Sequence, residues 1–230
     1  APQIADQMVQ ATGLSLLSTY MSAFEATNDL KTVAMCLEGM RGGVRLACLF
    51  SLKVEREAYI NAIAQLTLLE SVPSKEIKPK HIDALNALLT VAEEEGNLGE
   101  SWKRLLGCIS PLEKLLSTPQ PSSNKPSLAS STQYANNDDD HTPSPDELNA
   151  ATLSSKIRAI SIDRIFTNSS RLSDEAITDF VAALCQVSRS ELLAPTLSNQ
   201  TRTFSLQKLV EVADFNISRP KYVWMTIWNS

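Results

Sequence analysis

The stretch from Met35 to Leu69 reads MCLEGMRGGVRLACLFSLKVEREAYINAIAQLTLL and predicts two long helices joined at Ser51-Leu52-Lys53. Apolar residues recur three and four positions apart along the first helix, at Leu30, Val33, Leu37, Met40, Val44 and Ala47. The second helix has similar spacing, at Tyr59, Ile63, Leu66 and Leu69. Such spacing places one apolar stripe on each helix. Two amphipathic helices with a short turn form a helical hairpin, and each stripe needs a partner.

The same pattern continues along most of the chain. Further apolar stripes at helical spacing begin at Ile82, Trp102, Leu153, Ile177, Leu206 and Tyr222. No stretch shows the alternation of a strand, and helix pairs recur about every 40 residues, the period of stacked helix-pair repeats. The sequence therefore predicts an all-α protein: an armadillo/HEAT-like α-solenoid of antiparallel helix pairs, with roughly eight to ten helices.

Composition divides the chain into four parts. Residues 1–28 are expected to be a lead-in that contains an amphipathic helix and is broken at Gly13, and residues 29–116 and 151–230 are expected to be the two halves of the repeat array. Residues 117–150 are rich in Ser, Pro, Asn and Asp and almost lack large apolar side chains, which predicts a disordered insert. The insert contains Thr118-Pro119, Thr142-Pro143 and Ser144-Pro145 as candidate phosphorylation sites, although such pairs are common in disordered segments.

Three glycines, Gly39, Gly42 and Gly43, lie inside the first long helix. Each costs ~1 kcal/mol relative to alanine in a helix interior. They predict either a kink or a place where another helix packs very closely. A phosphate-binding loop is not indicated, because no strand precedes the glycines and no Gly-Lys-Ser/Thr follows them.

The sequence offers few groups for catalysis or metal binding. The net charge is −5, and residues 117–150 hold one lysine and five acidic residues, so the remainder is near neutral and does not indicate nucleic-acid binding. The histidines, His81 and His141, lack a supporting catalytic or metal-binding motif. We expect no catalysis, no metal and no cofactor.

Four cysteines stand in no C-x-x-C pair: Cys36, Cys48, Cys108 and Cys185. They predict reduced, mostly buried thiols of a cytosolic protein, with a disulfide or metal framework as the less favoured alternative. No apolar run of ~18 residues and no signal peptide are present, so no membrane span is predicted.

Three blocks resemble a known family: CLEGMRGGVRLACLF at 36–50, IDRIFTNSSRLSDEAITDFVAALCQVSRSELL at 162–193 and FSLQKLVEVADFNISRPKYVWMTIW at 204–228. In this order they are similar to the first conserved domain downstream of the catalytic domain in large Golgi Arf guanine-nucleotide exchange factors of the Sec-seven and brefeldin-A-inhibited type. The blocks are long, so the resemblance is specific.

The resemblance implies a non-catalytic regulatory module, because the Leu-Pro-Gly-Glu type motif of the family's catalytic domain is absent here. It implies roles in recruitment to Golgi membranes, in binding the GTP form of an Arf-family GTPase as positive feedback, and in autoinhibition of the catalytic domain. The implied location is cytoplasmic, peripheral to trans-Golgi membranes, in vesicle-mediated protein transport. The alternative is a purely structural α-solenoid segment that positions the catalytic domain and dimer contacts.

Two surfaces are candidate sites. Arg41 and Arg45 lie four residues apart and could contact an acidic GTPase, or alternatively form ion pairs with neighbouring helices. On a helix from Leu14 to Phe24, hydroxyl residues occupy one side, and the other side carries Leu14, Leu16, Leu17, Tyr20, Met21 and Phe24. No charge lies between Asp6 and Glu25, a composition typical of helices that bind membrane packing defects. Packing of the six side chains in the core is the alternative.

Overall fold

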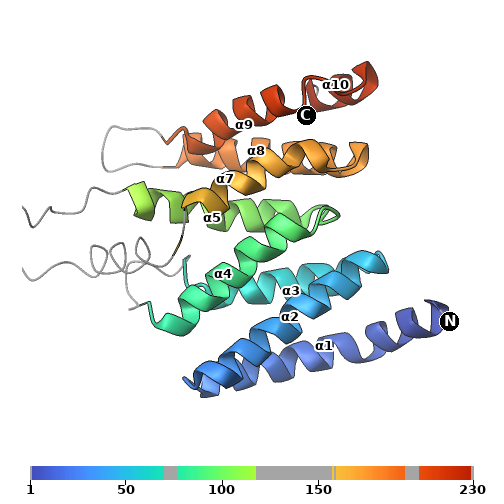
Figure 1. Ribbon diagram of the computed structural model, residues 1–230, viewed down its shortest axis with the longest axis vertical. Helices are drawn as coiled ribbons and strands as arrows, with labels where there is room; N and C mark the ends of the chain where they lie inside the picture. Colours follow the sequence, from blue (N-terminus) through green and yellow to red (C-terminus); the bar gives the residue numbers. More distant parts are fainter. Residues whose placement is uncertain (1, 70–76, 118–156, 158, 195–201, 229–230) are drawn as a thin grey trace, which may run out of the picture.

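The computed structural model describes residues 2–69, 77–117, 157, 159–194 and 202–228 (Figure 1). Every regular element in these ranges is a helix. Their bounds are α1 Pro2–Ala26, α2 Leu30–Leu49, α3 Lys53–Leu66, α4 Pro79–Glu94, α5 Ser101–Ser117, α7 Ala159–Thr167, the 3-10 helix η1 Asn168–Arg171, α8 Asp174–Leu193, α9 Phe204–Phe215 and α10 Lys221–Trp228.

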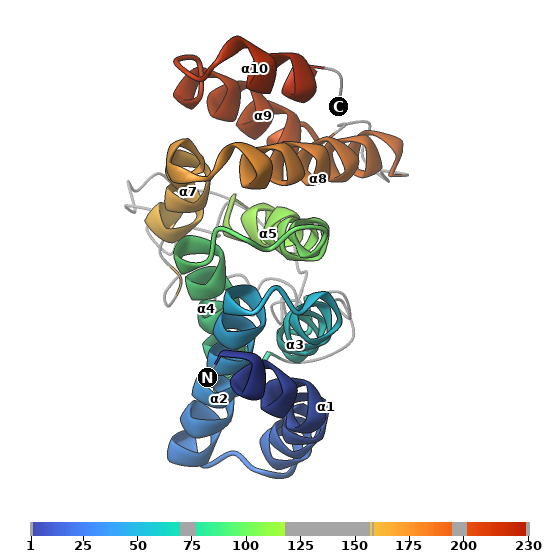
Figure 2. The same ribbon diagram turned by 90° about the vertical axis from the view of Figure 1, so that its right-hand side faces the viewer.

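The helices stack in two layers (Figures 1 and 2). One layer contains α1, α3, α5 and α8, each packed on the next, and the other contains α2, α4, α7 and α9. Neighbours in sequence pack across the layers, as in the pairs α1–α2, α3–α4 and α8–α9, and α10 packs on α8. The all-helical fold is confirmed, and the packing is that of a solenoid. The armadillo or HEAT type of the repeat stays a prediction, and residues 118–150 of the expected insert lie outside the described residues.

The helix starts follow the local signals that the sequence carries. Asp29 caps α2, since its carboxylate accepts a hydrogen bond from the backbone N–H of Thr32 at 2.9 Å. Ser173 caps α8, accepting from the N–H of Ala176 at 3.2 Å. Pro79 occupies the first turn of α4. Side chains that accept from free N–H groups stabilise a helix start, and proline is favoured there because it has no N–H to leave unpaired.

The expected break at Gly13 is wrong, because α1 is continuous from Pro2 to Ala26. Gly13 is buried, and the hydroxyl of Tyr59 in α3 donates a hydrogen bond to its carbonyl oxygen at 2.8 Å. At the other end of α1, Lys80 Nζ donates to the carbonyl oxygens of Phe24, Glu25 and Thr27 at 2.9, 3.2 and 2.9 Å. A cation on these unpaired carbonyls stabilises the helix C-terminus. Tertiary contacts thus hold α1 as the first helix of the stack.

Two of the three glycines in α2 are places of close packing, as predicted. A Cβ atom on Gly39 would lie 2.5 Å from Cζ of Tyr20, and one on Gly43 would lie 2.3 Å from Cε1 of Tyr59. The rings of Tyr20 and Tyr59 therefore rest directly on the α2 backbone, where only glycine leaves room. A Cβ on Gly42 would meet nothing within 4 Å.

The core runs through the whole stack. Trp102 of α5 and Phe180 of α8 meet edge to face with ring centroids 4.7 Å apart, and Phe166 of α7 packs on Phe180 at 6.2 Å. Each of the three side chains is at most 1% exposed. These contacts join α5 to the helices that follow 118–156, so the two halves of the array share one core.

A buried carboxylate fixes α9 against the stack. Glu191 of α8 is 6% exposed and accepts hydrogen bonds from the backbone N–H of Ser205 at 2.9 Å, from the Ser205 hydroxyl at 2.7 Å and from the Ser110 hydroxyl. A buried carboxylate needs such partners to offset its lost hydration. Glu191 therefore links α5, α8 and the start of α9, and helps to place the C-terminal layer.

Candidate functional site

The described ranges contain no group of three or more His, Cys, Asp or Glu side chains placed to hold a metal ion. His81 has a structural environment: its Nδ1 lies 2.8 Å from the carbonyl oxygen of Leu66, and its ring meets the edge of Phe24 at 6.2 Å. His141 lies outside the described residues.

All four cysteines are free thiols, and Cys36, Cys48 and Cys108 are buried as predicted, while Cys185 is partly exposed. Burial, with a smaller contribution from the nearby carboxylate of Glu95, raises the pKa of Cys48 to about 11, against the opposing effect of Arg56. A thiol with such a pKa is protonated at neutral pH and is a poor nucleophile. Cys48 accordingly acts as a core side chain.

Arg41 and Arg45 lie beside the C-terminal end of α4. Arg41 pairs with Glu38 at 3.0 Å and with Glu94 at 3.2 Å. Arg45 pairs with Glu94 and Glu95, both at 3.2 Å. This is the arrangement of the alternative interpretation, in which the two arginines form ion pairs with a neighbouring helix. Their role in GTPase binding stays a prediction.

The six apolar residues of the expected membrane-binding face have different environments. Leu17 and Phe24 are 8% and 1% exposed and belong to the core. Tyr20 and Met21 are partly buried against it, and only Leu14 and Leu16 are exposed, each 46%. While α1 packs on α2 and α3, four of the six side chains are therefore buried or partly buried in the core. Membrane binding by the six residues stays a prediction that requires α1 to leave this position.

None of the helices in the described part of the chain is both long and apolar enough to span a membrane.

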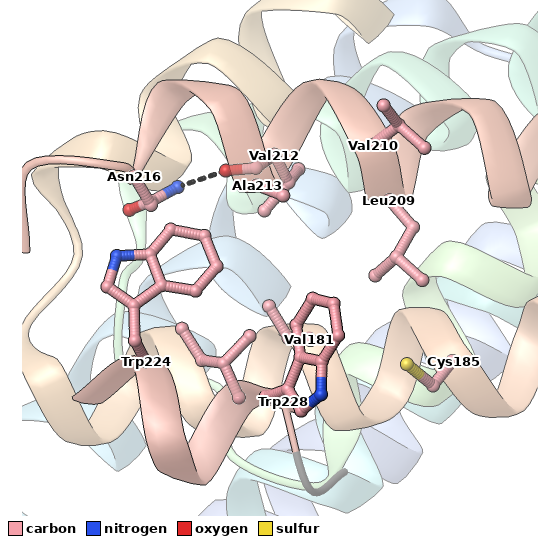
Figure 3. A pocket seen from close by; sticks show the side chains of 10 residues that line it. Val181, Cys185, Leu209, Val210, Val212, Ala213, Asn216, Trp224 and Trp228 are labelled. Atoms are coloured by element: carbon pink, nitrogen blue, oxygen red, sulfur yellow. Dashed lines mark hydrogen bonds between the residues drawn. The ribbon is translucent and has the colours of Figure 1, made fainter. Parts of the chain in front are cut away.

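An apolar groove opens at the C-terminal end of the stack (Figure 3). Its volume is ≈ 340 Å³. Helices α8, α9 and α10 form its walls, with Val181, Cys185, Leu209, Val210, Val212, Ala213, Asn216, Trp224, Ile227 and Trp228 as the lining residues. The indole of Trp228 is 85% exposed at the mouth, and Val210 is 67% exposed. Exposed apolar groups gathered around a concavity mark a surface that binds another molecule.

Polar contacts around the turn between α9 and α10 hold the walls of the groove in place. The Arg219 side chain, in the turn between α9 and α10, donates to Asn216 Oδ1 at 2.6 Å, to Asp174 Oδ1 at 2.8 Å and to the carbonyl oxygen of Leu172 at 2.6 Å. Asn216 Nδ2 in turn donates to the carbonyl oxygen of Val212 at 2.7 Å. Trp224 Nε1 donates to the carbonyl oxygen of Ile217 at 3.2 Å. The groove is thus built on a fixed turn.

The sequence reasoning did not identify this groove, although a signal for it was present. The segment KYVWMTIW of α10 is apolar on more than one side, and a helix of that kind must be covered on more than one side. Val223 is buried, whereas Tyr222, Met225 and Trp228 are exposed. Part of the apolar surface of α10 is therefore uncovered.

Known proteins with similar sequences identify the family, although no protein-family model matches the chain. The chain is 37% identical over 239 residues to brefeldin A-inhibited guanine nucleotide-exchange protein 1 of Mus musculus, which covers 92% of this chain and 13% of the relative. It is 32% identical over 247 residues to the ADP-ribosylation factor guanine nucleotide-exchange factor sec72 of Schizosaccharomyces pombe, which covers 96% of this chain and 13% of the relative.

A plant relative gives the same result. Brefeldin A-inhibited guanine nucleotide-exchange protein 3 of Arabidopsis thaliana is 31% identical over 265 residues, with 96% of this chain and 15% of the relative covered. The chain thus spans only 13–15% of the length of these three relatives, while nearly all of the chain is matched. The resemblance predicted from the sequence is confirmed, and the chain belongs, as one segment, to the family of brefeldin A-inhibited guanine nucleotide-exchange proteins.

Proposed function

We propose that this chain is a non-catalytic regulatory segment of an Arf guanine-nucleotide exchange factor and that it binds an Arf-family GTPase in the GTP form. The observation that carries the proposal is the similarity over 92–96% of the chain to proteins named as guanine-nucleotide exchange factors, one of them for ADP-ribosylation factor. In the full-length protein the segment acts at Golgi membranes of the trans side, where it supports recruitment, positive feedback by GTP-loaded Arf and control of autoinhibition.

The apolar groove between α8, α9 and α10 is the proposed contact for the GTPase. Its support is physical: exposed apolar side chains such as Val210 and Trp228 surround a concavity whose walls are fixed by the Arg219 contacts. A weak contact is sufficient, because a membrane that carries both proteins raises their effective concentration. The sequence-based candidates, Arg41 and Arg45, remain a second proposed contact and are tested separately.

The test is co-flotation of the purified chain with liposomes that carry lipidated Arf, loaded with GTP or with GDP. We expect retention with the GTP form, loss in Val210→Asp, and retention in the control Leu193→Asp, since Leu193 is 83% exposed at the end of α8 and does not line the groove. Loss in Arg41→Glu with Arg45→Glu would instead place the contact on α2. Equal retention with GDP and GTP, or none with either, would overturn the proposal.

Direct membrane contact by α1 is part of the proposal in a limited form. Because Leu17 and Phe24 are buried, Leu14 and Leu16 are the exposed members of the predicted six-residue face while α1 is packed. Flotation with small neutral liposomes that lack Arf tests this contact, and we expect Leu14→Ser with Leu16→Ser to reduce it. Binding that does not depend on vesicle size would count against a helix that recognises packing defects.

A purely structural segment is the second candidate function. The position of the groove favours it, because α9 and α10 are the outermost helices packed on α8, and the outer side of such a helix pair is where a neighbouring repeat of a solenoid packs. Exposed apolar residues on α2 favour a binding module instead. Helix α2 packs on α4 along the side of the stack, away from the groove, and yet leaves Met35, Leu46 and Leu49 exposed. If Val210→Asp destabilises a longer exchange factor but the isolated chain never binds Arf, the structural function is correct.

A further inference from the structure

A second, polar pocket opens between the C-terminal end of α4 and the 3-10 helix η1, with a volume of ≈ 270 Å³. It shares no lining residue with the apolar groove between α8, α9 and α10. We call it the α4–η1 pocket. Its polar lining residues come from the end of α4, from the start of α5 and from η1: Glu93, Glu94, Glu95, Trp102, Asn168 and Arg171.

Contacts within the chain hold two walls of the α4–η1 pocket. On the α4 side, Arg45 pairs with Glu94 and with Glu95, both at 3.2 Å. On the η1 side, the guanidinium of Arg219 donates a hydrogen bond to the carbonyl oxygen of Ser169 at 3.2 Å. The pocket is therefore formed before any ligand is present, which lowers the entropic cost of binding.

Two buried polar atoms of the pocket residues are left without partners. Trp102 is 1% exposed, and its Nε1–H donates to no acceptor within the part of the chain that the structure describes. The Oε1 atom of Glu93 is buried and accepts no hydrogen bond from these residues either. A donor and an acceptor that have lost water without gaining partners both destabilise the folded chain. A ligand that satisfies both atoms therefore recovers this loss when it binds.

The two atoms require different groups of a ligand. Glu93 stands at the C-terminal end of α4, where the helix dipole adds to its negative charge, so its partner is a cation. That cation is organic, because no group of three His, Cys, Asp or Glu side chains among the described residues is placed to hold a metal ion. The Trp102 indole is only a donor and needs an acceptor such as a carbonyl oxygen. Asn168 and Arg171 offer an amide and a guanidinium for further main-chain groups.

We infer that the α4–η1 pocket binds an extended, basic peptide segment of a partner protein. An arginine side chain of the peptide donates to Glu93, and a main-chain carbonyl oxygen next to it accepts from Trp102 Nε1. A guanidinium fits a carboxylate better than an ammonium group does, because it can donate two parallel hydrogen bonds. This site is independent of the proposed GTPase contact, since the two share no residue.

Nuclear magnetic resonance of the purified, ¹⁵N-labelled chain tests the pocket, with acetyl-Ala-Arg-Ala-amide as the probe. The chain has three tryptophans, and Trp102→Phe identifies the indole N–H signal of Trp102. If that variant does not fold, Trp224→Phe and Trp228→Phe identify it by elimination. We expect the probe to shift the Trp102 signal and to leave the other two unchanged. The same peptide with citrulline in place of arginine keeps the shape, lacks the charge and should bind far more weakly.

A charge-removing variant tests the role of Glu93. Glu93→Gln keeps the shape of the side chain, and the dissociation constant of the arginine peptide should rise roughly tenfold or more. The matched control is Glu175→Gln, because Glu175 is exposed in the first turn of α8 and does not line the pocket. It should leave the dissociation constant unchanged. Circular dichroism verifies that both variants are folded.

Three results would overturn this assignment. A Trp102 signal that does not move at the highest peptide concentration would mean that water alone fills the pocket. Equal binding of the citrulline peptide, or unchanged binding in Glu93→Gln, would remove the carboxylate from the site. Shifts confined to Trp224 and Trp228 would place the peptide in the apolar groove instead.

Discussion

The junction of α1, α2 and α3 is closed, whereas the end formed by α8, α9 and α10 is open. At the junction the rings of Tyr20 and Tyr59 lie on glycines of α2, and Phe24 is 1% exposed. At the other end Val210 and Trp228 remain more than 60% exposed around a groove. Both regions are rich in large apolar side chains. Large side chains are therefore closely packed at the junction, whereas apolar surface around an open concavity lies at the other end.

This difference predicts that replacing a large apolar side chain by alanine lowers the free energy of unfolding much more at the junction than at the groove. Removing a closely packed side chain loses its transfer free energy and leaves a cavity, while removing an exposed one loses little.

Phe24→Ala should lower the free energy of unfolding by about 3–5 kcal/mol, because the buried ring packs on His81 and lies under the ammonium group of Lys80. Urea unfolding followed by circular dichroism measures this change. Leu14→Ala, at a residue that is 46% exposed on the same helix, is the control and should cost far less. A loss of under about 1 kcal/mol for Phe24→Ala would mean that α1 is not held in the core.

Gly43→Ala should destabilise the chain by roughly 1–3 kcal/mol, because the added Cβ would lie 2.3 Å from the Tyr59 ring and must displace it. Gly42→Ala, one residue away, should stabilise the chain by up to about 1 kcal/mol, because its Cβ is free of contacts and alanine favours the helix. Thermal unfolding compares the two. Changes of the same sign would contradict the close packing of α3 on α2.

Tyr59→Phe should cost about 1 kcal/mol, since it removes the hydrogen bond to the carbonyl oxygen of Gly13 and keeps the ring. Burial raises the pKa of the Tyr59 hydroxyl above its ordinary value of 10.0, with a smaller contribution from Tyr20. The stabilisation by the neutral hydroxyl is therefore complete below pH 10 and is lost as the pH rises through the higher pKa of the folded state. Urea unfolding at several alkaline pH values should show a smaller decline in the variant than in wild type.

Trp228→Ala should change the free energy of unfolding by less than about 0.5 kcal/mol, because 85% of the side chain is exposed. The same substitution should reduce co-flotation with GTP-loaded Arf if the groove is the GTPase contact. Urea unfolding and flotation on one preparation separate the two effects. A loss of stability well above 1 kcal/mol would show that the groove is more tightly closed than its exposed residues indicate.

Much of the architecture was determined by the sequence alone, because helix formation depends on short-range features. The spacing of Val33, Met40 and Val44 predicts the buried stripe of α2, and the caps at Asp29 and Ser173 lie where the sequence predicts helix starts. The three long blocks predicted the family, which the relatives confirm.

What covers each apolar face was decided only by the tertiary structure. A helix that lies on a membrane and a helix that packs in a core each bury one apolar side. The pattern from Leu14 to Phe24 is therefore compatible with either environment. Contacts from distant residues hold α1 in place in this fold. The Tyr59 hydroxyl donates a hydrogen bond to the carbonyl oxygen of Gly13, and Lys80 caps the C-terminal end of α1. The pairing of Arg45 with Glu94 and Glu95, about 50 residues away, depends likewise on how α2 and α4 meet. A periodic pattern fixes which side of a helix is buried, and only packing in three dimensions fixes the surface it is buried against.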